Sequence, residues 1–158
     1  MDKAEAETRA RIVTEAKSWI NTPYHHHGRV KGVGVDCAQI LIAVYSEAGF
    51  IPKFDPGHYP PDWHLHHDDE RYLSFVLPYV REMEEEEARL PGDLMLIKYG
   101  RAFAHSAIII EWPLCIHALM RSPVCYTNPE QDAAFREYGN TGKKLRPRRF
   151  FSMRKSEA

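Results

Sequence analysis

The sequence predicts an α+β fold, because helical patterns fill its first part and strand patterns its second part. Residues 4–20 and 36–48 carry apolar side chains at helical spacing. The later apolar runs are short and bounded by turn residues; they cover residues 94–97, 104–110 and 114–119. This order is typical of a mostly antiparallel sheet packed against helices. We expect residues 1–158 to form one domain.

The composition excludes several classes of protein. The 158 residues are 44% hydrophobic and carry 21 basic and 22 acidic side chains, so no net field favours nucleic acid or an anionic membrane. Three cysteines are too few for a disulfide framework. The first residues lack the apolar core of a signal peptide, and no run approaches transmembrane length. We expect synthesis in the cytoplasm without a signal peptide, and no cofactor.

Two helices frame the first third of the chain. The first should end before Pro23, because the residue preceding a proline is disfavoured in the α region. The second should begin after Asp36, a good N-cap, and end near Ala48 with Gly49 as its C′ residue. It is apolar on nearly all sides, so we expect it to be the buried central helix. Cys37 then lies in its first turn, where the helix dipole favours the reactive thiolate.

The remaining segments are assigned more coarsely. Residues 24–34 read as a loop with a turn-forming Gly34, and the proline-rich residues 52–63 as a stiff loop. Residues 72–80 are helical in pattern, and the acidic residues 82–87 form a solvated face. Residues 144–153 are expected to be a final strand or an edge strand, where Pro147 is tolerated.

A cysteine nucleophile needs a base and a group that orients the base. Among nine histidines, His105 and His117 lie in apolar strand patterns, where an imidazole requires an explanation. A connection at residues 110–112 would place them directly opposite each other on one sheet face, whereas a one-residue slip would separate them. From spacing alone, two structural histidines remain an alternative.

Four blocks in order resemble the NlpC/p60 superfamily of papain-like cysteine peptidases, which cleave cell-wall peptides. They are Thr22-Pro23-Tyr24, then Gly34-Val35-Asp36-Cys37, then Pro91-Gly92-Asp93-Leu94, and finally His105-Ser106-Ala107-Ile108 with Ile116-His117-Ala118. Each block alone is weak, but four in this order are specific. The resemblance implies a papain-like fold with the nucleophile at the head of the central helix.

The resemblance also implies a role for each matching residue. Cys37 would be the nucleophile, His105 the general base and His117 the residue that orients it. Tyr24 would help to bind the substrate or the oxyanion, together with the backbone N–H of Cys37. Asp36 and Ala38, which flank the nucleophile, are expected at the same substrate and oxyanion subsite. The family's usual bond joins the D-glutamate side chain to a diamino acid in peptidoglycan stem peptides.

Two departures from the family concern specificity. Ala38-Gln39 stands where the family usually has Ser-Gly, and Ser106-Ala107 where it usually has Val-Gly. Within the superfamily, the loop 24–34 and the stretch Pro60-Pro61-Asp62-Trp63-His64 resemble the phage-tail and gene-transfer-agent branch. That resemblance implies phage-tail proteins as partners and delivery to the wall by a phage-like particle.

Other interpretations stand beside these. The groups His25-His26-His27 and His64-His66-His67 invite a zinc site, but their spacing is not that of known zinc sites, and we expect cleft residues and no metal. Tyr59 and Trp63 are either cleft walls or loop packing. Arg146, Arg148 and Arg149 either contact an anionic wall polymer or protect an edge strand. We take Cys115 as a core residue and Cys125 as a loop thiol.

Two rival functions remain open at this point. One is a thiol acyltransferase or amidase on the same scaffold, because the motif does not specify the acceptor. The other is a tail-assembly component without catalytic activity.

Overall fold

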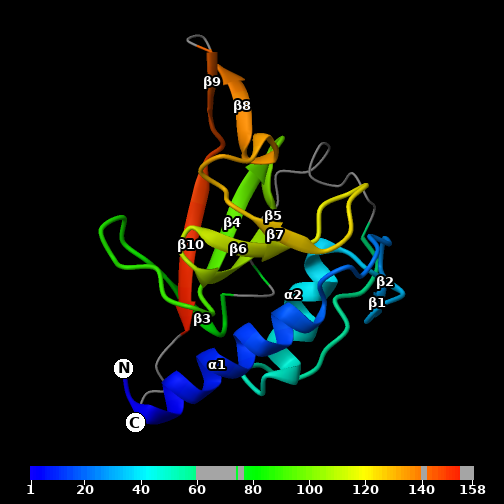
Figure 1. The fold of residues 1–158 in the computed structure, drawn as a ribbon, viewed down its shortest axis with the longest axis vertical. Coiled ribbons are helices and arrows are strands. Elements are labelled where there is room, and N and C mark those ends of the chain that lie inside the picture. Colours follow the sequence, from blue (N-terminus) through cyan, green and yellow to red (C-terminus); the bar gives the residue numbers. More distant parts are fainter. Residues whose placement is uncertain (60–73, 75–76, 140–141, 154–158) are drawn as a thin grey trace.

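The computed structural model describes residues 1–59, 74, 77–139 and 142–153 (Figure 1). Two helices, α1 (Lys3–Ser18) and α2 (Cys37–Glu47), precede a six-stranded sheet. In spatial order the sheet contains β3 (Val80–Glu82), β10 (Arg148–Met153), β4 (Leu94–Tyr99), β5 (Ala102–Glu111), β6 (Leu114–His117) and β7 (Cys125–Thr127). All neighbouring strands pair antiparallel. The α+β prediction is therefore confirmed.

Two small hairpins and one short helix complete the described elements. The hairpin of β1 (Arg29–Val30) and β2 (Gly34–Val35) lies directly before α2. The 3₁₀ helix η1 (Ala133–Phe135) leads into the hairpin of β8 (Arg136–Gly139) and β9 (Gly142–Leu145). Figure 1 shows this second hairpin projecting from the sheet at the end away from α1.

The sheet separates two apolar layers, because successive side chains of a strand point to opposite faces. One layer packs Leu94, Leu96 and Ile108 against Ile12 of α1 and Leu41 of α2. The other layer covers the opposite face and contains Met95, Ile97, Ala107, Ile109, Cys115, Phe135 and Phe150. Cys115 is fully buried there, as predicted.

The central helix is buried on all sides, as its composition predicts. Every residue from 38 to 45 is buried, so α2 lies between α1 and the sheet. Gly49 follows the C-cap Ala48 with a φ of +77°, the left-handed conformation that glycine adopts without strain. The predicted second helix is confirmed at both ends.

A buried ion pair joins α1 to the sheet. The Arg9 guanidinium donates to Asp93 Oδ1 at 2.7 Å, and the Ser152 hydroxyl donates to the same oxygen at 2.6 Å. Arg9 is only 4% exposed although it lies in a charged stretch of α1. Nearby, the Tyr45 hydroxyl donates to the Gly92 carbonyl at 2.9 Å. The Pro91-Gly92-Asp93 block therefore connects the helices to the sheet.

Several predictions about individual segments are wrong. Val80 begins strand β3 instead of ending a helix, and most of residues 72–76 lie outside the described part of the chain. Residues 144–153 are divided between β9 and β10; β10 is the final strand, as predicted, but it lies inside the sheet between β3 and β4. Cys125 lies in β7 and not in a loop.

The basic residues at the end of the chain neutralise acidic partners. Arg148 pairs with Glu130 at 2.7 Å, and Arg149 pairs with Glu82 at 2.6 Å. Only residues 151–153 of β10 pair with β3. Arg148 and Arg149 lie before this paired part, so the prediction of an edge strand protected by charge is wrong only for residues 151–153.

No helix in the described part of the chain is long and apolar enough to span a membrane.

Candidate active site

Cys37 occupies the first turn of α2, where its sequence places it. Asp36 is the N-cap, and its Oδ1 accepts the backbone N–H groups of Ala38 at 3.1 Å and Gln39 at 2.8 Å. These bonds satisfy amide groups that the first turn of a helix leaves unpaired. Cys37 is half-buried. The helix dipole at this end favours its thiolate.

The hairpin before α2 approaches its own loop closely. A Cβ atom on Gly34 would lie 2.6 Å from Cβ of His25, and one on Gly28 would lie 2.7 Å from the Gly34 backbone. Gly34 is therefore needed for close packing inside β2, and the turn itself is made at Gly32, whose φ is +78°. This corrects the turn role predicted for Gly34.

Strand β5 contacts Cys37 through two residues. The Cys37 Sγ lies 3.6 Å from the carbonyl oxygen of Ala104, and the Ser106 hydroxyl donates to the Cys37 carbonyl at 3.2 Å. His105 is the residue between them. The register between β4 and β5 shifts at Ile97/Lys98, opposite this position. Such a bulge increases the local twist and redirects side chains, and it is frequent beside active sites.

His105 and His117 meet on one face of the sheet. Nε2 of His105 lies 3.0 Å from Nδ1 of His117. The predicted register is wrong by two residues, because Ile108 pairs with Ile116 and the turn is Trp112-Pro113. His117 therefore lies diagonally across from His105. A two-residue shift preserves the face, and diagonal neighbours are within reach of such rings.

Burial controls the charge of both imidazoles. Desolvation lowers the pKa of His105 well below its ordinary value, and the charge of His117 lowers it further. Desolvation also lowers the pKa of His117 to about 4, and the Asp132 carboxylate opposes this shift. Phe135 stacks on His117 with ring centroids 5.4 Å apart and lies 6.1 Å from His105. Both rings are therefore neutral near pH 7.

Tyr24 lies near Cys37. It forms an isolated bridge with Val35 at the end of β2, two residues before Cys37. Burial raises the pKa of the Tyr24 phenol, and the charges of Cys37 and Asp36 raise it further. The phenol therefore stays protonated and can donate a hydrogen bond at this site.

The residues that flank Cys37 are engaged with each other. Asp36 is 1% exposed, and its Oδ2 accepts the Tyr59 hydroxyl at 2.6 Å and the His27 backbone N–H at 2.9 Å. The backbone N–H of Ala38 donates to the Asp36 cap. A substrate or oxyanion contact of Asp36 or Ala38 would have to compete with these bonds.

The histidine loop packs around Tyr59. The rings of His26 and His27 each place Nε2 2.9 Å from the Tyr59 carbonyl oxygen, whereas His25 is exposed. The described residues contain no cluster of three or more histidine, cysteine, aspartate or glutamate side chains suited to a metal ion. His64, His66, His67 and Trp63 lie outside the described residues.

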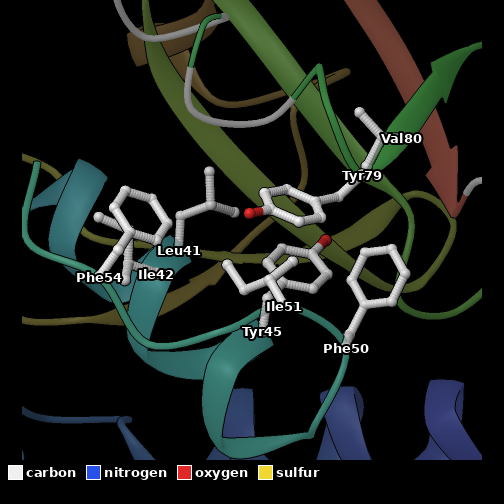
Figure 2. Close-up of a pocket in the computed structure, with 8 residues that line it drawn as sticks. All are labelled: Leu41, Ile42, Tyr45, Phe50, Ile51, Phe54, Tyr79 and Val80. Atoms are coloured by element: carbon white, nitrogen blue, oxygen red, sulfur yellow. The ribbon is translucent and has the colours of Figure 1, made fainter.

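An apolar pocket lies further along α2. Figure 2 shows its lining, which comes from α2, the segment after it and the residues where β3 begins. The lining residues are Leu41, Ile42, Tyr45, Phe50, Ile51, Phe54, Tyr79 and Val80. The cavity measures about 20 Å³, which is too small for a peptide. Its lining contains no member of the Cys37 site.

The structure adds residues that the sequence pattern does not single out. Phe135 and Asp132 contact or influence the histidine pair, and Ser106 contacts Cys37. Of these, only Ser106 lies in a family-like block. Asp132 and Phe135 come from an irregular segment, and their one local signal is the N-cap position of Asp132 before η1.

Comparison with family models and with curated protein sequences finds no match. Among solved structures, the NlpC/p60 domain of the peptidoglycan hydrolase SagA is 24% identical with a TM-score of 0.56, over 79% of this chain and 92% of that chain. NlpC2 from Trichomonas vaginalis is 17% identical with a TM-score of 0.57, over 84% of this chain and 45% of that one.

An NLP/P60 family protein from Staphylococcus aureus is 22% identical with a TM-score of 0.56, over 85% of this chain and 41% of that chain. This chain thus spans less than half the length of the T. vaginalis and S. aureus chains. At these identities the likeness concerns the fold. The protein has the fold of NlpC/p60 domains.

Proposed function

We propose that this protein is a cysteine peptidase that hydrolyses amide bonds in peptidoglycan stem peptides, with Cys37 as its nucleophile. One observation carries the proposal: both neighbours of His105 in β5 contact Cys37, while His105 itself contacts His117. We infer from this proximity along β5 that Cys37 acts as the nucleophile, His105 as the base and His117 as the group that orients the base. The similar fold of a peptidoglycan hydrolase domain supports the substrate class.

The first chemical step uses the neutral histidine pair. With its Nε2–H donated to Nδ1 of His117, His105 keeps the Nδ1 lone pair for the proton of the Cys37 thiol. The thiolate attacks the amide carbonyl, and the charge that develops on oxygen is stabilised by the Tyr24 phenol and the Cys37 backbone N–H. The His105 imidazolium then protonates the leaving amine, which departs and leaves a thioester on Cys37.

The second step regenerates the enzyme. His105 removes a proton from water, and the resulting hydroxide attacks the thioester carbonyl. Collapse of the tetrahedral intermediate releases the carboxylic acid product and the thiolate, and the proton on His105 returns to sulfur. His117 accepts the His105 Nε2–H throughout and so keeps the ring in one tautomer.

The finer proposal concerns the bond and the setting. We propose cleavage between the side chain of D-glutamate and a diamino acid, in a protein delivered by a phage-like particle. The resemblance of blocks 22–24, 34–37 and 105–108 supports the bond, and that of loop 24–34 supports the particle. Residues 60–64, which also resemble the phage-tail branch, lie outside the described residues.

Digestion of purified peptidoglycan tests the function. The wild type should release new muropeptides, detected by mass spectrometry, and Cys37→Ala should release none. Cys125→Ala is the matched control, because it removes a half-buried thiol that lies in β7. Identical muropeptide profiles for the wild type and Cys37→Ala would refute the peptidase proposal.

The same digestion separates the rival functions. An acyltransferase would transfer the acyl group to an added amine, and the product mass would then contain that amine. A component without activity would leave the wall uncut, and its Cys37 would react slowly with iodoacetamide near neutral pH.

A further inference from the structure

Tyr59 joins the segment after α2 to the residue before the nucleophile. Its side chain is buried, with 7% exposed, and its hydroxyl donates to Asp36 Oδ2 at 2.6 Å. Burial raises the pKa of this phenol, and the hydrogen bond to Asp36 raises it further. The Tyr59 hydroxyl therefore stays protonated and donates its hydrogen bond to the Asp36 carboxylate.

The Tyr59 backbone is anchored independently of its hydroxyl. Its carbonyl oxygen lies 2.9 Å from Nε2 of both His26 and His27, and its ring stacks on His27 with centroids 4.0 Å apart. These contacts hold the aromatic ring against the loop even without the phenolic oxygen. A phenylalanine at this position would keep the ring contacts and lose the bond to Asp36.

Asp36 depends on donors at both oxygens. Oδ1 caps α2, and Oδ2 accepts the Tyr59 hydroxyl and the His27 N–H. A carboxylate offers about four lone-pair sites, so these four bonds saturate it. A buried negative charge next to a thiolate would otherwise disfavour that thiolate.

Gln39 lies beside the same contact. It is 4% exposed, and it lowers the pKa of the Tyr59 phenol, against the larger rise that burial causes. Its Oε1 is buried without a hydrogen-bond partner among the described residues. Gln39 is one of the two positions that depart from the family pattern after Cys37.

We propose that Tyr59 is a positioning residue for Cys37: its hydroxyl fixes Asp36 as the cap of α2 and offsets the carboxylate charge beside the thiolate. The proposal deepens the proposed function, because it takes Cys37 as the nucleophile. It assigns the substrate no contact with Asp36, whose oxygens are already occupied by the protein.

Other ionisable groups also surround Cys37. Tyr24 and Tyr99 interact electrostatically with it, and His105 lies beside Ala104, which contacts the sulfur. His26 Nδ1 lies 3.7 Å from Asp36 Oδ2. Changing Tyr59 alone leaves all of these groups in place, so a changed titration of Cys37 would report on the lost hydroxyl.

The test is the pH dependence of Cys37 alkylation by iodoacetamide, measured without peptidoglycan. In Tyr59→Phe the midpoint should rise by about 0.5 to 1 pH unit, and alkylation below the midpoint should slow by about three- to ten-fold. Tyr45→Phe is the matched control, because it removes another buried hydroxyl, bonded to Gly92 away from the site, and should leave the midpoint unchanged.

The outcomes are distinguishable. A lower melting temperature with an unchanged midpoint would show a purely structural role and overturn the proposal. If Tyr59→Phe does not fold, Tyr59→Leu takes its place, because it also removes the hydroxyl, and a raised midpoint supports the proposal whereas an unchanged one overturns it. Wild-type protein that leaves peptidoglycan uncut, with the Tyr59→Phe shift present, refutes the peptidase function and keeps this inference.

Discussion

The head of α2 and the histidine pair on β5 and β6 are stabilised by different interactions. Around Asp36, four hydrogen bonds converge on one carboxylate. Around His105 and His117, one contact at 3.0 Å joins the two rings, and the rings of Phe135 and Tyr99 pack against them. Cys37 therefore lies beside a fully hydrogen-bonded charge, and the two imidazoles lie in a desolvated apolar layer.

This difference between the head of α2 and the histidine pair matches the charge that each of the two parts must carry. A thiolate needs the dipole and donors of a helix terminus, whereas a base must be neutral before it accepts a proton. Hydrogen bonds hold the charged half in place, and burial lowers the pKa of the imidazoles in the other half. Substitutions around Asp36 and substitutions of the two histidines should therefore change different measurable properties of the protein.

Removing the base should have the largest effect. In His105→Ala, kcat/KM on a stem-peptide substrate should fall by about 10³-fold, because general-base catalysis is lost. Alkylation of Cys37 at alkaline pH should persist, because this substitution leaves the hydrogen bonds to the Asp36 carboxylate intact. His25→Ala, which removes an exposed imidazole, is the control. Activity within ten-fold of the wild type would contradict the role of His105.

Removing the cap should have the next largest effect, on stability. Asp36→Ala leaves buried donors without an acceptor and should lower the free energy of unfolding by about 3 kcal/mol in urea titrations. Asp2→Ala is the control, because it removes the N-cap of α1, whose side chain accepts the Glu5 N–H in an exposed position. This substitution should lower the free energy of unfolding by about 1 kcal/mol or less. Equal losses would show that the Asp36 network adds nothing to ordinary capping.

The histidine half should govern stability in acid. His117 has a pKa of about 4 in the folded protein against its ordinary 6.5, so below pH 6.5 the unfolded chain binds a proton that the folded one does not. Stability should therefore fall from pH 6.5 towards 4, with a contribution from His117 on the order of 3 kcal/mol.

Urea midpoints measured between pH 7 and 4.5 check this prediction. His117→Gln should flatten the fall, and a residual slope should remain because the pKa of His105 is also lowered. His25→Gln controls for the loss of an exposed histidine. An unchanged slope in His117→Gln would contradict the burial effect.

Local sequence patterns were sufficient for the helix side of the site. The Asp36 cap, the first-turn position of Cys37 and the Gly49 terminus depend on residues within one helical turn, and the structure confirms each of them. The shared face of His105 and His117 was also predictable despite a wrong register, because strand alternation has period two and the error was two residues.

Contacts between distant segments were decided only by the tertiary structure. Tyr59 reaches Asp36 across 23 residues, and Arg9 reaches Asp93 across 84. The insertion of β10 between β3 and β4, and the packing of Phe135 on the histidines, likewise have no local signal. The sequence by itself determined the helix that carries Cys37 and the face that carries its histidines. Only packing decided what surrounds them, because a capping or alternation pattern is complete within a few residues, whereas a buried contact depends on where two separate segments meet.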